Sequence, residues 1–509
     1  MFAKALSGTP YGVDAVLVEV QCDVSPGIPA FSIVGLADKE VTEARERIRS
    51  AFKNSDLPFP DLRVTVNLAP ADLRKEGVGL DLALAVALLG AEGEVPVESL
   101  SDTVFLGELS LDGKLRSVRG VLPVALAAAQ AGIRRMVVPA KTAPEAALVE
   151  GIAVYPVESL LQTVAFLKGE LTIPPSSPTI PESGGGGWLD LSLIKGQEHA
   201  RRALEIAAAG GHNLIMVGPP GTGKSLLARC LPGILPPLSF PEALEVTKIY
   251  SAAGLLPPGV ALIRERPFRA PHHTISYVGM VGGGAGVPSP GEITLAHHGV
   301  LFLDELPEFE RRVLEALRQP LEDRRITITR AGVSVTFPAS FTLIGAMNPC
   351  PCGYLGDPHH ACRCRPHEIQ RYWRRLSGPF LDRIDLFVHV PRLEREELLG
   401  DGGGEPSEAV RARVTAAREV QERRFGGPRT NAEMGVEELR RFCRLSPQAK
   451  ALLSRAIDHY GLSARAYARI LKVSRTIADL SGKDIIGPEA IAEALQYRPQ
   501  EEVVTWVSI

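Results

Sequence analysis

Residues 214–225 read LIMVGPPGTGKS and carry the strongest indication of the fold. Leu214–Val217 is an apolar run that predicts a buried strand, and Gly218–Ser225 matches the phosphate-binding pattern G-x-x-x-x-G-K-[ST]. Gly221 and Gly223 allow the backbone to turn its amides towards phosphate oxygens, and the helix expected next points its positive end at the same anion. The order of strand, loop and helix therefore predicts an α/β domain that binds the phosphates of a nucleotide.

Two side chains at the end of this loop carry its chemistry. Lys224 is expected to reach the β- and γ-phosphates of ATP, and Ser225 to hold Mg²⁺ through its hydroxyl. A chance glycine-rich turn is the alternative, but the strand before the loop and the helix-forming run Leu226–Cys230 after it argue against that. The residues predicted to bind the nucleotide are Gly218, Pro219, Pro220, Gly221, Thr222, Gly223, Lys224 and Ser225.

A second apolar strand ends in two acidic residues. Val300–Leu303 (VLFL) is followed by Asp304, expected to hold Mg²⁺, and by Glu305, expected to activate the attacking water. Many strands end in acids, so this pattern is weak alone and becomes strong after a phosphate loop. We expect the two elements on neighbouring parallel strands of one α/β sheet.

Two further candidates for the hydrolytic site follow along the chain. Asn348 comes after the predicted strand Phe341–Ala346 and is expected to orient the water, although a polar residue at a strand end is commonly a turn residue. Arg383, in the segment Ser377–Asp385, is a candidate arginine finger for the ATP of a neighbouring subunit. Its alternative is an ordinary arginine–aspartate pair.

Composition limits the partners of the chain. Its 509 residues suggest two to four domains, and 56 Lys and Arg against 59 Asp and Glu give a net charge of −3. This excludes a surface coated in positive charge, so a nucleic-acid site would be a local patch or a channel. The longest apolar run, around Leu82–Ala91, is shorter than the roughly 18 residues of a membrane span, and the first residues show no secretory signal. We expect a cytoplasmic protein with no membrane partner.

A segment rich in Pro, Ser and Gly, residues 172–187, predicts a flexible linker. It separates an N-terminal domain of residues 1–171 from an ATPase core of residues 188–395. Residues 396–509 are expected to form a C-terminal helical lid.

The predicted N-terminal domain mixes alternating strands with apolar helices. Ala15–Val20 and Leu62–Leu68 read as half-buried strands, Asp81–Leu89 as a core helix, and Gly107–Leu115 as a hairpin around Asp112-Gly113.

Four of the seven cysteines lie within 15 residues, in the pattern C-x-C-x9-C-x-C. Four thiolates suit a tetrahedral structural Zn²⁺, although C-x-C is tighter than the usual C-x2-C. His359 or His360 could replace one ligand, and four unligated cysteines in a tight loop are the other reading. We expect Cys22, Cys230 and Cys443 to pack as small apolar residues. The predicted metal ligands are Cys350, Cys352, Cys362 and Cys364.

Two segments are candidates for contact with nucleic acid. Ile326–Pro338 reads as a β-hairpin with Arg330 at its tip, a phosphate-contact candidate or simply a surface arginine. Residues 264–289 combine basic side chains, two histidines and three consecutive glycines, which suits a loop that grips a backbone without reading sequence. The histidines could instead be satisfied structural groups. The basic residues and histidines of this segment are Arg264, Arg266, Arg269, His272 and His273.

The motifs GPPGTGKS, VLFLDELPEF, IGAMNPCPCGY and SGPFLDRIDL together resemble the magnesium-chelatase-like AAA+ ATPases of the YifB/ComM family. FRAPHHTIS (268–276), PGEITLAHHG (290–299) and LSARAYARILKVSRTIADL (462–480) belong to the same pattern, so the resemblance runs from Met1 to about Gln500. It implies a ring, expected to be a hexamer, that uses ATP to act as a DNA helicase or branch-migration factor. The DNA would be single-stranded or branched, and the setting recombination in natural transformation.

The resemblance also implies roles for particular residues. Arg465 corresponds to the sensor-2 arginine of the lid, with Arg469 one turn further on as a second candidate, and the hairpin carrying Arg330 would project into the pore. The N-terminal part resembles the α/β (S5-like) proteolytic domain of Lon proteases, but Gly79 stands where the Lon serine would be. Arg119–Val124, where the Lon lysine would lie, contains no lysine. The Ser–Lys pair is absent, which predicts a scaffold or partner-binding module and not a protease.

Two rival functions remain open from the sequence. One is the ATPase subunit of a magnesium chelatase, against which the Lon-like part and the cysteine cluster speak. The other is a protein-remodelling ATPase, which would need an aromatic pore loop; Tyr277-Val278-Gly279 is the nearest candidate.

Overall fold

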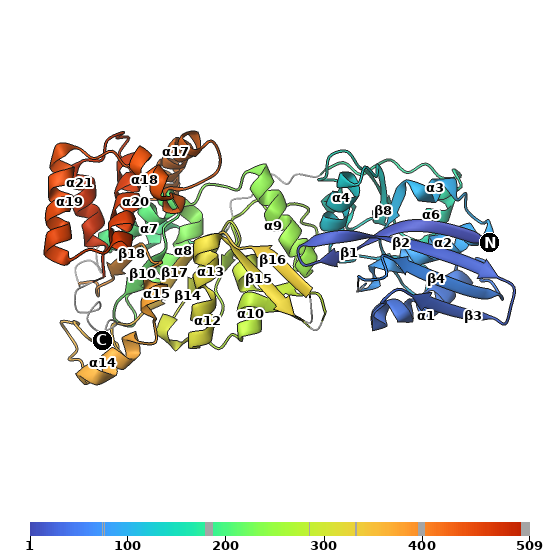
Figure 1. Ribbon diagram of the computed structural model, residues 1–509, viewed down its shortest axis with the longest axis horizontal. Helices are drawn as coiled ribbons and strands as arrows, with labels where there is room; N and C mark the ends of the chain where they lie inside the picture. The colour runs from blue at the N-terminus through green and yellow to red at the C-terminus, as the bar shows by residue number, and fades with distance from the viewer. Residues whose placement is uncertain are drawn as a thin grey trace.

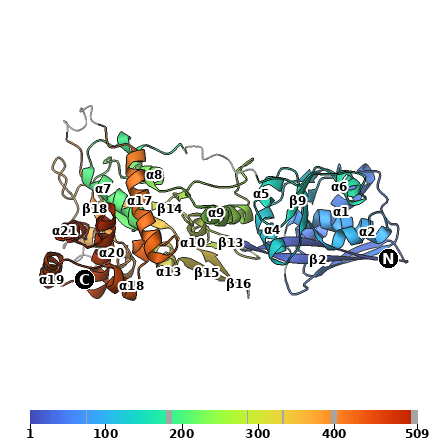
Figure 2. The same cartoon turned by 90° about the horizontal axis from the view of Figure 1, so that it is seen from above.

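The computed structural model describes residues 1–73, 75, 77–178, 187–284, 286–330, 333–394 and 403–499. The molecule is elongated, with the N-terminal sheet at one end and the C-terminal helices at the other (Figures 1 and 2). No helix within these ranges is long and apolar enough to cross a membrane.

The N-terminal part is built on a seven-stranded mixed sheet in the order β3-β4-β2-β1-β5-β8-β9. Alternation along β2 divides its faces: Val18 and Val20 pack with helices α1 and α2, whereas Leu17 packs on the side of α4. The strands predicted around 15–20 and 62–68 and the core helix from Asp81 are confirmed. The strands are β1 (Phe2–Tyr11), β2 (Asp14–Ser25), β3 (Ala30–Val34), β4 (Arg63–Ala69), β5 (Thr103–Phe105), β8 (Arg135–Pro139) and β9 (Ala153–Val157). The helices are α1 (Lys39–Asn54), α2 (Asp81–Glu92), α3 (Glu98–Ser101), α4 (Val121–Gln130), α5 (Ala143–Ala146) and α6 (Leu160–Leu167).

The small hairpin predicted around Asp112-Gly113 is confirmed as β6 (Glu108–Leu109) paired with β7 (Leu115–Arg116). Of the predicted linker, residues 172–178 and 187 are described. Ile173 is buried in the N-terminal core, and Ser176 donates its N–H to the Val154 carbonyl, so the start of this segment packs on the N-terminal sheet.

The ATPase part contains a five-stranded parallel sheet in the order β11-β14-β17-β10-β18. The strand β17 lies between β10 and β14, so the expectation that the phosphate-loop strand and the acidic strand are direct neighbours is wrong. Their carboxyl ends nevertheless meet at one edge, because all five strands run in the same direction. The strands are β10 (Leu214–Val217), β11 (Phe268–Arg269), β14 (Val300–Leu303), β17 (Thr342–Met347) and β18 (Leu386–His389).

Helices cover both faces of this sheet. Leu214 and Met216 of β10 face the cluster that contains α7 and α8, whereas Ile215 faces the cluster with α12 and α13. The helices of this part are α7 (Glu198–Gly210), α8 (Lys224–Ile234), α9 (Phe240–Ala253), α10 (Tyr277–Val281), α11 (Glu292–Leu295), α12 (Arg311–Ala316), α13 (Arg318–Asp323), α14 (Pro366–Trp373) and α15 (Gly378–Leu381).

Two antiparallel pairs extend from the ATPase part. The predicted hairpin at 326–338 is confirmed as β15 (Arg325–Arg330) paired with β16 (Val333–Pro338), and its turn lies outside the described residues. The glycine-rich stretch pairs β12 (Gly282–Gly283) with β13 (Ser289–Pro290).

The C-terminal part is helical over most of Ser407–Gln496, as predicted for a lid. Its buried face merges with the cluster that holds β10 and α7, so the lid and the ATPase sheet share one core. The predicted fold class, an α/β multidomain chain that ends in helices, is confirmed. The helices are α17 (Ser407–Phe425), α18 (Val436–Phe442), α19 (Pro447–Tyr460), α20 (Ala464–Leu480) and α21 (Pro488–Gln496).

Candidate functional site

The phosphate loop connects β10 to α8, as its sequence predicts. Gly218 donates its N–H to the Met347 carbonyl at 3.2 Å, and a Cβ at this position would lie 2.1 Å from the Val390 carbonyl oxygen, so only glycine fits. Gly221 and Gly223 have φ of +79° and +86°, in the region that favours glycine. The helix α8 begins at Lys224, which directs its amino end at the loop.

The ammonium group of Lys224 is held inside the loop. Its Nζ donates to the carbonyls of Gly218 at 2.7 Å and Pro219 at 2.8 Å, and lies 3.4 Å from Oδ1 of Asn348. Burial of this side chain lowers the pKa of Lys224 to about 8. A nucleotide phosphate placed here would restore full charge to the amine.

Oxygen ligands for a magnesium ion meet at the carboxyl edge of the sheet. The Ser225 hydroxyl donates to Oδ2 of Asp304 at 2.6 Å, and Oδ1 of Asp304 accepts the N–H of Glu305 at 3.0 Å. A hydroxyl and a carboxylate side by side are the hard oxygen donors that Mg²⁺ takes beside nucleotide phosphates. The residues present therefore fit the predicted ion.

The carboxylate of Glu305 has a partner that the sequence did not identify. Its Oε2 lies 3.0 Å from Nδ1 of His273, and its backbone adopts φ of +52°, a left-handed conformation that is uncommon outside glycine. His273 follows β11, whose pairing with β14 at Phe268↔Val300 brings the FRAPHHTIS segment beside the acidic strand end. In the sequence, only the FRAPHHTIS motif pointed to His273. Its contact with Glu305 could not be predicted, because the two residues are far apart along the chain.

Asn348 lies where the sequence places it, directly after β17. The central position of β17 puts this side chain between the phosphate loop and the acidic strand end, in reach of Lys224. Further on, the backbone of Gly353 packs against the ring of Pro220, since a Cβ at 353 would lie 2.8 Å from Cδ of that proline.

Arg383 and Arg465 lie together, and the structure does not bring them to Lys224 of the same chain. Arg383 donates from Nε to the Arg318 carbonyl at 3.1 Å and pairs with Glu322. Nη1 of Arg465 lies 3.2 Å from Oδ2 of Asp382, the residue before Arg383. Both arginines line one cavity of about 540 Å³.

Strand register explains why these arginines and the phosphate loop are apart. β18 pairs with β10 at Leu214↔Leu386, and Asp385 donates its N–H to the Asn213 carbonyl, so the Arg383 segment lies at the amino edge of the sheet. The phosphate loop leaves the carboxyl edge after four residues of β10, which span roughly 13 Å. Within this motif Asp385 contacts His212 at 3.2 Å and Asp382 contacts Arg465. Arg383 itself forms an ordinary ion pair, with Glu322 in place of an aspartate of the motif.

Arg469, the second lid candidate, is turned into the structure. It donates to the carbonyls of Leu381 and Ile384, so it anchors α20 to the segment that carries Arg383. His212 ties the same segment to α20 through Thr476 at 2.8 Å.

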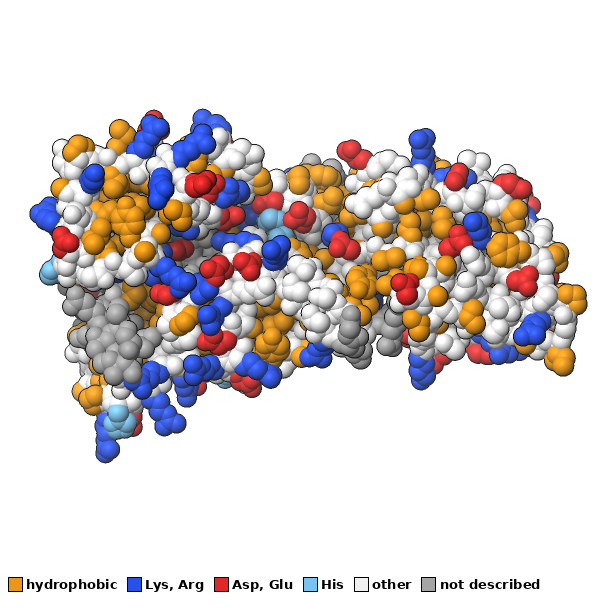
Figure 3. All heavy atoms as spheres, viewed as in Figure 1, with side chains coloured by type: hydrophobic (Ala, Val, Ile, Leu, Met, Phe, Trp, Pro, Cys, Tyr) orange, Lys and Arg blue, Asp and Glu red, His pale blue; other side chains and the backbone are white. Residues whose placement is uncertain are grey.

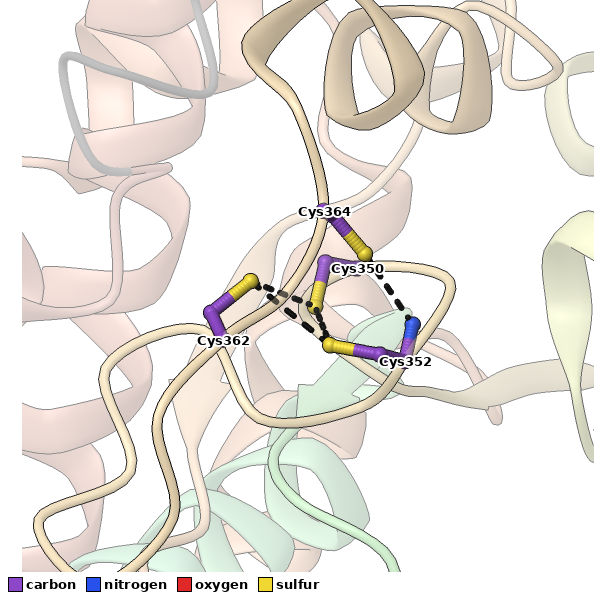
Figure 4. A group of neighbouring side chains, drawn as sticks. All are labelled: Cys350, Cys352, Cys362 and Cys364. Carbon is purple, nitrogen blue, oxygen red and sulfur yellow. Dashed lines mark hydrogen bonds between the residues drawn. The ribbon is translucent and has the colours of Figure 1, made fainter.

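The four cysteines come together as a compact cluster (Figure 4). Their Sγ atoms all lie within 4.8 Å of one another, with 3.4 Å between Cys350 and Cys352 and 3.7 Å between Cys350 and Cys362. A tetrahedral zinc with Zn–S bonds of about 2.3 Å separates its sulfurs by roughly 3.8 Å. The spacing therefore fits a Cys₄ zinc site.

The two nearby histidines lie outside the cysteine cluster. His360 stacks on Tyr354 and lies 3.7 Å from Oδ1 of Asp357, whose carboxylate also accepts the N–H groups of residues 359 and 360. Neither imidazole belongs to the cluster of possible metal ligands found among the described residues.

The remaining cysteines pack as predicted. Cys22, Cys230 and Cys443 are buried and free, and burial raises the pKa of each thiol, to about 12 for Cys22.

A second group of potential ligands, Glu245 with His297 and His298, does not suit a metal. The backbone N–H of Ser340 donates to Nδ1 of His297 at 3.0 Å, so the proton of this imidazole sits on Nε2. That Nε2 lies 3.1 Å from Glu245 and donates to it, which leaves no lone pair for an ion. The group is a hydrogen-bonded clamp between α9 and the start of β14.

The two candidate nucleic-acid segments meet. Arg330 at the hairpin tip lies over the backbone of Gly283, because a Cβ there would be 3.7 Å from Cζ of the guanidinium. The loop contributes less positive charge than expected, since Arg269 forms a bidentate pair with Glu292 at 2.6 Å and Arg266 pairs with Glu242. Lys and Arg side chains nevertheless crowd the ATPase and lid end of the face in Figure 3.

Apolar side chains lie next to Gly79, at the position where the Lon serine would be. A Cβ there would lie 3.3 Å from Cδ1 of Leu106 and 4.0 Å from Cβ of Val118, two apolar neighbours. Lys75, four residues before Gly79, is buried, and its ammonium group donates to the carbonyl of Pro70.

Comparison with known proteins agrees with this arrangement. A family model described as magnesium chelatase, subunit ChlI, matches residues 190–398; a model of subunit ChlI of Mg-chelatase matches 20–142, and one of the ChlI C-terminal part matches 404–498. The chain is 47% identical to competence protein ComM of Haemophilus influenzae over 503 residues, 97% of each chain. It is 45% identical over 489 residues to YifB of Escherichia coli, an uncharacterized protein, covering 96% of this chain and 95% of that one.

Part of the chain is also similar to a protease. Lon protease 2 of Bacillus subtilis is 29% identical over 186 residues, which cover 31% of this chain and 32% of that one.

The lowered pKa of Lys224 predicts that nucleotide binding takes up protons. Near pH 8 the free amine is about half protonated, and the phosphates raise its pKa, so binding should take up about half a proton per site. Titration calorimetry with a non-hydrolysable ATP analogue, in buffers of different ionisation enthalpy, measures this uptake. It should vanish at about pH 6.5, where Lys224 is already charged, and affinity should fall above about pH 8. An uptake independent of pH would contradict the assignment.

Proposed function

The chain belongs to the magnesium-chelatase-like AAA+ ATPase family that contains ComM and YifB, and from this premise we propose that it is a ring-forming motor that moves on DNA. The motor binds ATP with Mg²⁺ and couples hydrolysis to DNA unwinding or branch migration. The Lon-like N-terminal domain takes no part in proteolysis, because Gly79 stands where the Lon nucleophile would be and Arg119–Val124 contains no lysine.

ATP hydrolysis is assigned to the carboxyl edge of the sheet. Lys224 neutralises the β- and γ-phosphates. Ser225 and Asp304 would hold Mg²⁺, which would supply positive charge to the transferring phosphoryl group. Glu305 takes the proton of the attacking water, and Asn348 orients that water beside the γ-phosphate. His273, whose Nδ1 lies 3.0 Å from Oε2 of Glu305, positions this carboxylate.

The site is completed by a neighbouring subunit. Arg383 and Arg465 lie at the opposite edge of the sheet from Lys224, so they serve the nucleotide of the next subunit and make ring assembly a condition of turnover. We expect six subunits. The anchoring of Arg469 and His212 to the same segment links this arginine pair to the movement of the lid.

The contact of Arg330 with Gly283 supports DNA as the track. It places an exposed guanidinium over a glycine-rich backbone at the tip of a hairpin, which suits phosphate contacts without sequence readout. A relative of this chain is named a competence protein, which supports a role in competence. We propose that this role is recombination during natural transformation, in the cytoplasm, on single-stranded or branched DNA.

The rival functions are less well supported. The name of the family models keeps a chelatase ATPase subunit as the second candidate, but the relatives that match nearly the whole chain are ComM and YifB. For protein remodelling, Tyr277 would have to offer a free ring, and Arg312 lies 4.8 Å above that ring.

The cysteine cluster is proposed as a structural Zn²⁺ site with Cys350, Cys352, Cys362 and Cys364 as ligands. Cys350 follows Asn348 by two residues and Gly353 packs on Pro220, so the metal would fix the loop between the water-orienting side chain and the phosphate loop.

Purified protein with ATP and Mg²⁺ should separate the strands of a forked DNA. Lys224→Ala should abolish unwinding, because the γ-phosphate loses its cation, and Glu305→Gln should bind ATP but hydrolyse it roughly 10²- to 10⁴-fold more slowly. Absence of unwinding by the parent at all nucleotide and Mg²⁺ concentrations would reject the helicase, and normal turnover by Glu305→Gln would remove Glu305 as the base.

Mixing two inactive variants tests the shared site. Arg383→Ala keeps an intact phosphate loop, and Lys224→Ala keeps an intact Arg383. Mixed rings therefore contain interfaces in which the phosphate loop comes from one variant and Arg383 from the other. We predict recovery of ATPase activity on mixing, although each variant alone has lost most of its turnover, roughly 10³-fold or more for the arginine. Activity that stays at the level of the separate variants would show that Arg383 acts within its own chain.

Zinc content tests the cysteine cluster. Elemental analysis of the purified protein should give about one zinc per chain, since four thiolates fill one tetrahedral shell. Cys362→Ser should lose the metal, whereas Cys443→Ser, a matched change of a buried cysteine in the lid, should retain it. Equal zinc content in both variants would contradict the site.

A further inference from the structure

The turn between β1 and β2 reaches out of the N-terminal sheet and into the ATPase part (Figures 1 and 2). Tyr11 pairs with Asp14, which leaves Gly12 and Val13 as a two-residue turn. Val13 is 3% exposed and belongs to the same buried cluster as Val335 and Phe337 of β16. An N-terminal residue is therefore part of the core under the Arg330 hairpin.

The hairpin depends on this core, because an isolated two-stranded ribbon is marginally stable. Its outer face is polar, with Thr327 and Thr336 hydroxyls 3.0 Å apart. Its inner face holds the buried side chains that pack it down. The residues packed against this inner face therefore determine where Arg330 lies. The inward residues are Ile326, Ile328, Val335 and Phe337.

Gly12 makes the closest part of this contact. Its φ is +68°, and a Cβ built on it would lie 2.5 Å from Cγ1 of Val335 and 3.4 Å from Cε1 of Phe337. The first distance is shorter than two non-bonded carbon atoms can approach. Both the positive φ and the lack of space for a Cβ therefore require glycine at this position. The turn is seated directly against the side chains of β16.

A second set of contacts joins the N-terminal domain to α9, and these contacts hold the Gly12-Val13 turn in place. Gly120 donates its N–H to the Ser251 carbonyl at 2.9 Å. The buried carboxylate of Glu145 accepts the Ser251 hydroxyl and the N–H of Leu122. Lys248 pairs with Asp14, the residue after the turn, at 2.6 Å. The N-terminal domain is therefore packed against the ATPase part by hydrogen bonds and an ion pair, in addition to the linker.

We propose that the N-terminal domain braces the β15–β16 hairpin through the Gly12-Val13 turn and so holds Arg330 where it engages DNA. The inference rests on the proposed function for its DNA readout, and on packing alone for its mechanical part. Gly12 and Val13 are positioning residues, and they touch neither nucleotide nor the phosphate loop. A partner that binds the N-terminal domain can then alter DNA engagement by displacing this turn.

The test compares Gly12→Ala with Gly93→Ala in the full-length chain. Gly93 has φ of +80°, and a Cβ added to it would have nothing within 4 Å, so both variants strain the backbone alike and only Gly12→Ala crowds β16. Val13→Ala, which removes the contact without backbone strain, is the second variant. Hydrogen exchange of residues 325–330 and 333–338 reports the hairpin, and ATPase rates with and without single-stranded DNA report coupling.

In Gly12→Ala and in Val13→Ala, the hairpin amides should exchange roughly tenfold faster than in Gly93→Ala. The exchange rates of the α20 amides should stay unchanged. Their basal ATPase rates should match the parent, while the DNA-stimulated increment falls several-fold. Unchanged hairpin exchange in both variants overturns the brace. Faster exchange with full DNA stimulation overturns the coupling to DNA. A parent that shows no DNA stimulation counts against the proposed function, and the exchange data still decide the brace.

Discussion

All five strands of the ATPase sheet run in the same direction, and this parallel pairing determines where the candidate site residues lie. It sends the ends of β10, β14 and β17 to the same edge, where the phosphate loop, Asp304 and Asn348 follow them. It also sends the start of β18, with Arg383 just before it, to the other edge. In the proposed site, a single chain carries the phosphate loop with the acidic residues at one edge and Arg383 at the other. The proposed ring follows from this separation.

The elements around the sheet connect these halves to the surfaces that would move. The lid shares its core with β10 and α7, and α20 is tied to the Arg383 segment by Arg469 and His212. On the opposite side, His273 joins the acidic strand end to the segment that leads into the glycine-rich stretch beside Arg330. We propose that these contacts couple the proposed nucleotide site to the lid and to the Arg330 hairpin.

Sequence patterns predicted the elements that depend on local chemistry. The phosphate loop, the hairpins, the core helix at Asp81 and the helical lid each have a signal within a few residues, such as glycine spacing, alternation or an apolar run. What depends on spatial order was missed. The insertion of β17 between β10 and β14, the His273–Glu305 contact and the engagement of Arg269 by Glu292 all join residues that periodicity along the chain does not relate. The seat of the β1–β2 turn on β16 spans more than 300 residues of sequence, and only the folded domains bring the two together.

The most direct test of the divided site is turnover per chain as a function of protein concentration, measured beside the assembly state by mass photometry with ATP and Mg²⁺. We expect that chains diluted to monomers bind nucleotide but scarcely hydrolyse it, and that turnover per chain rises in step with the fraction in rings. Full turnover by monomers would show that one chain completes its own site, and would contradict the division of the site between subunits.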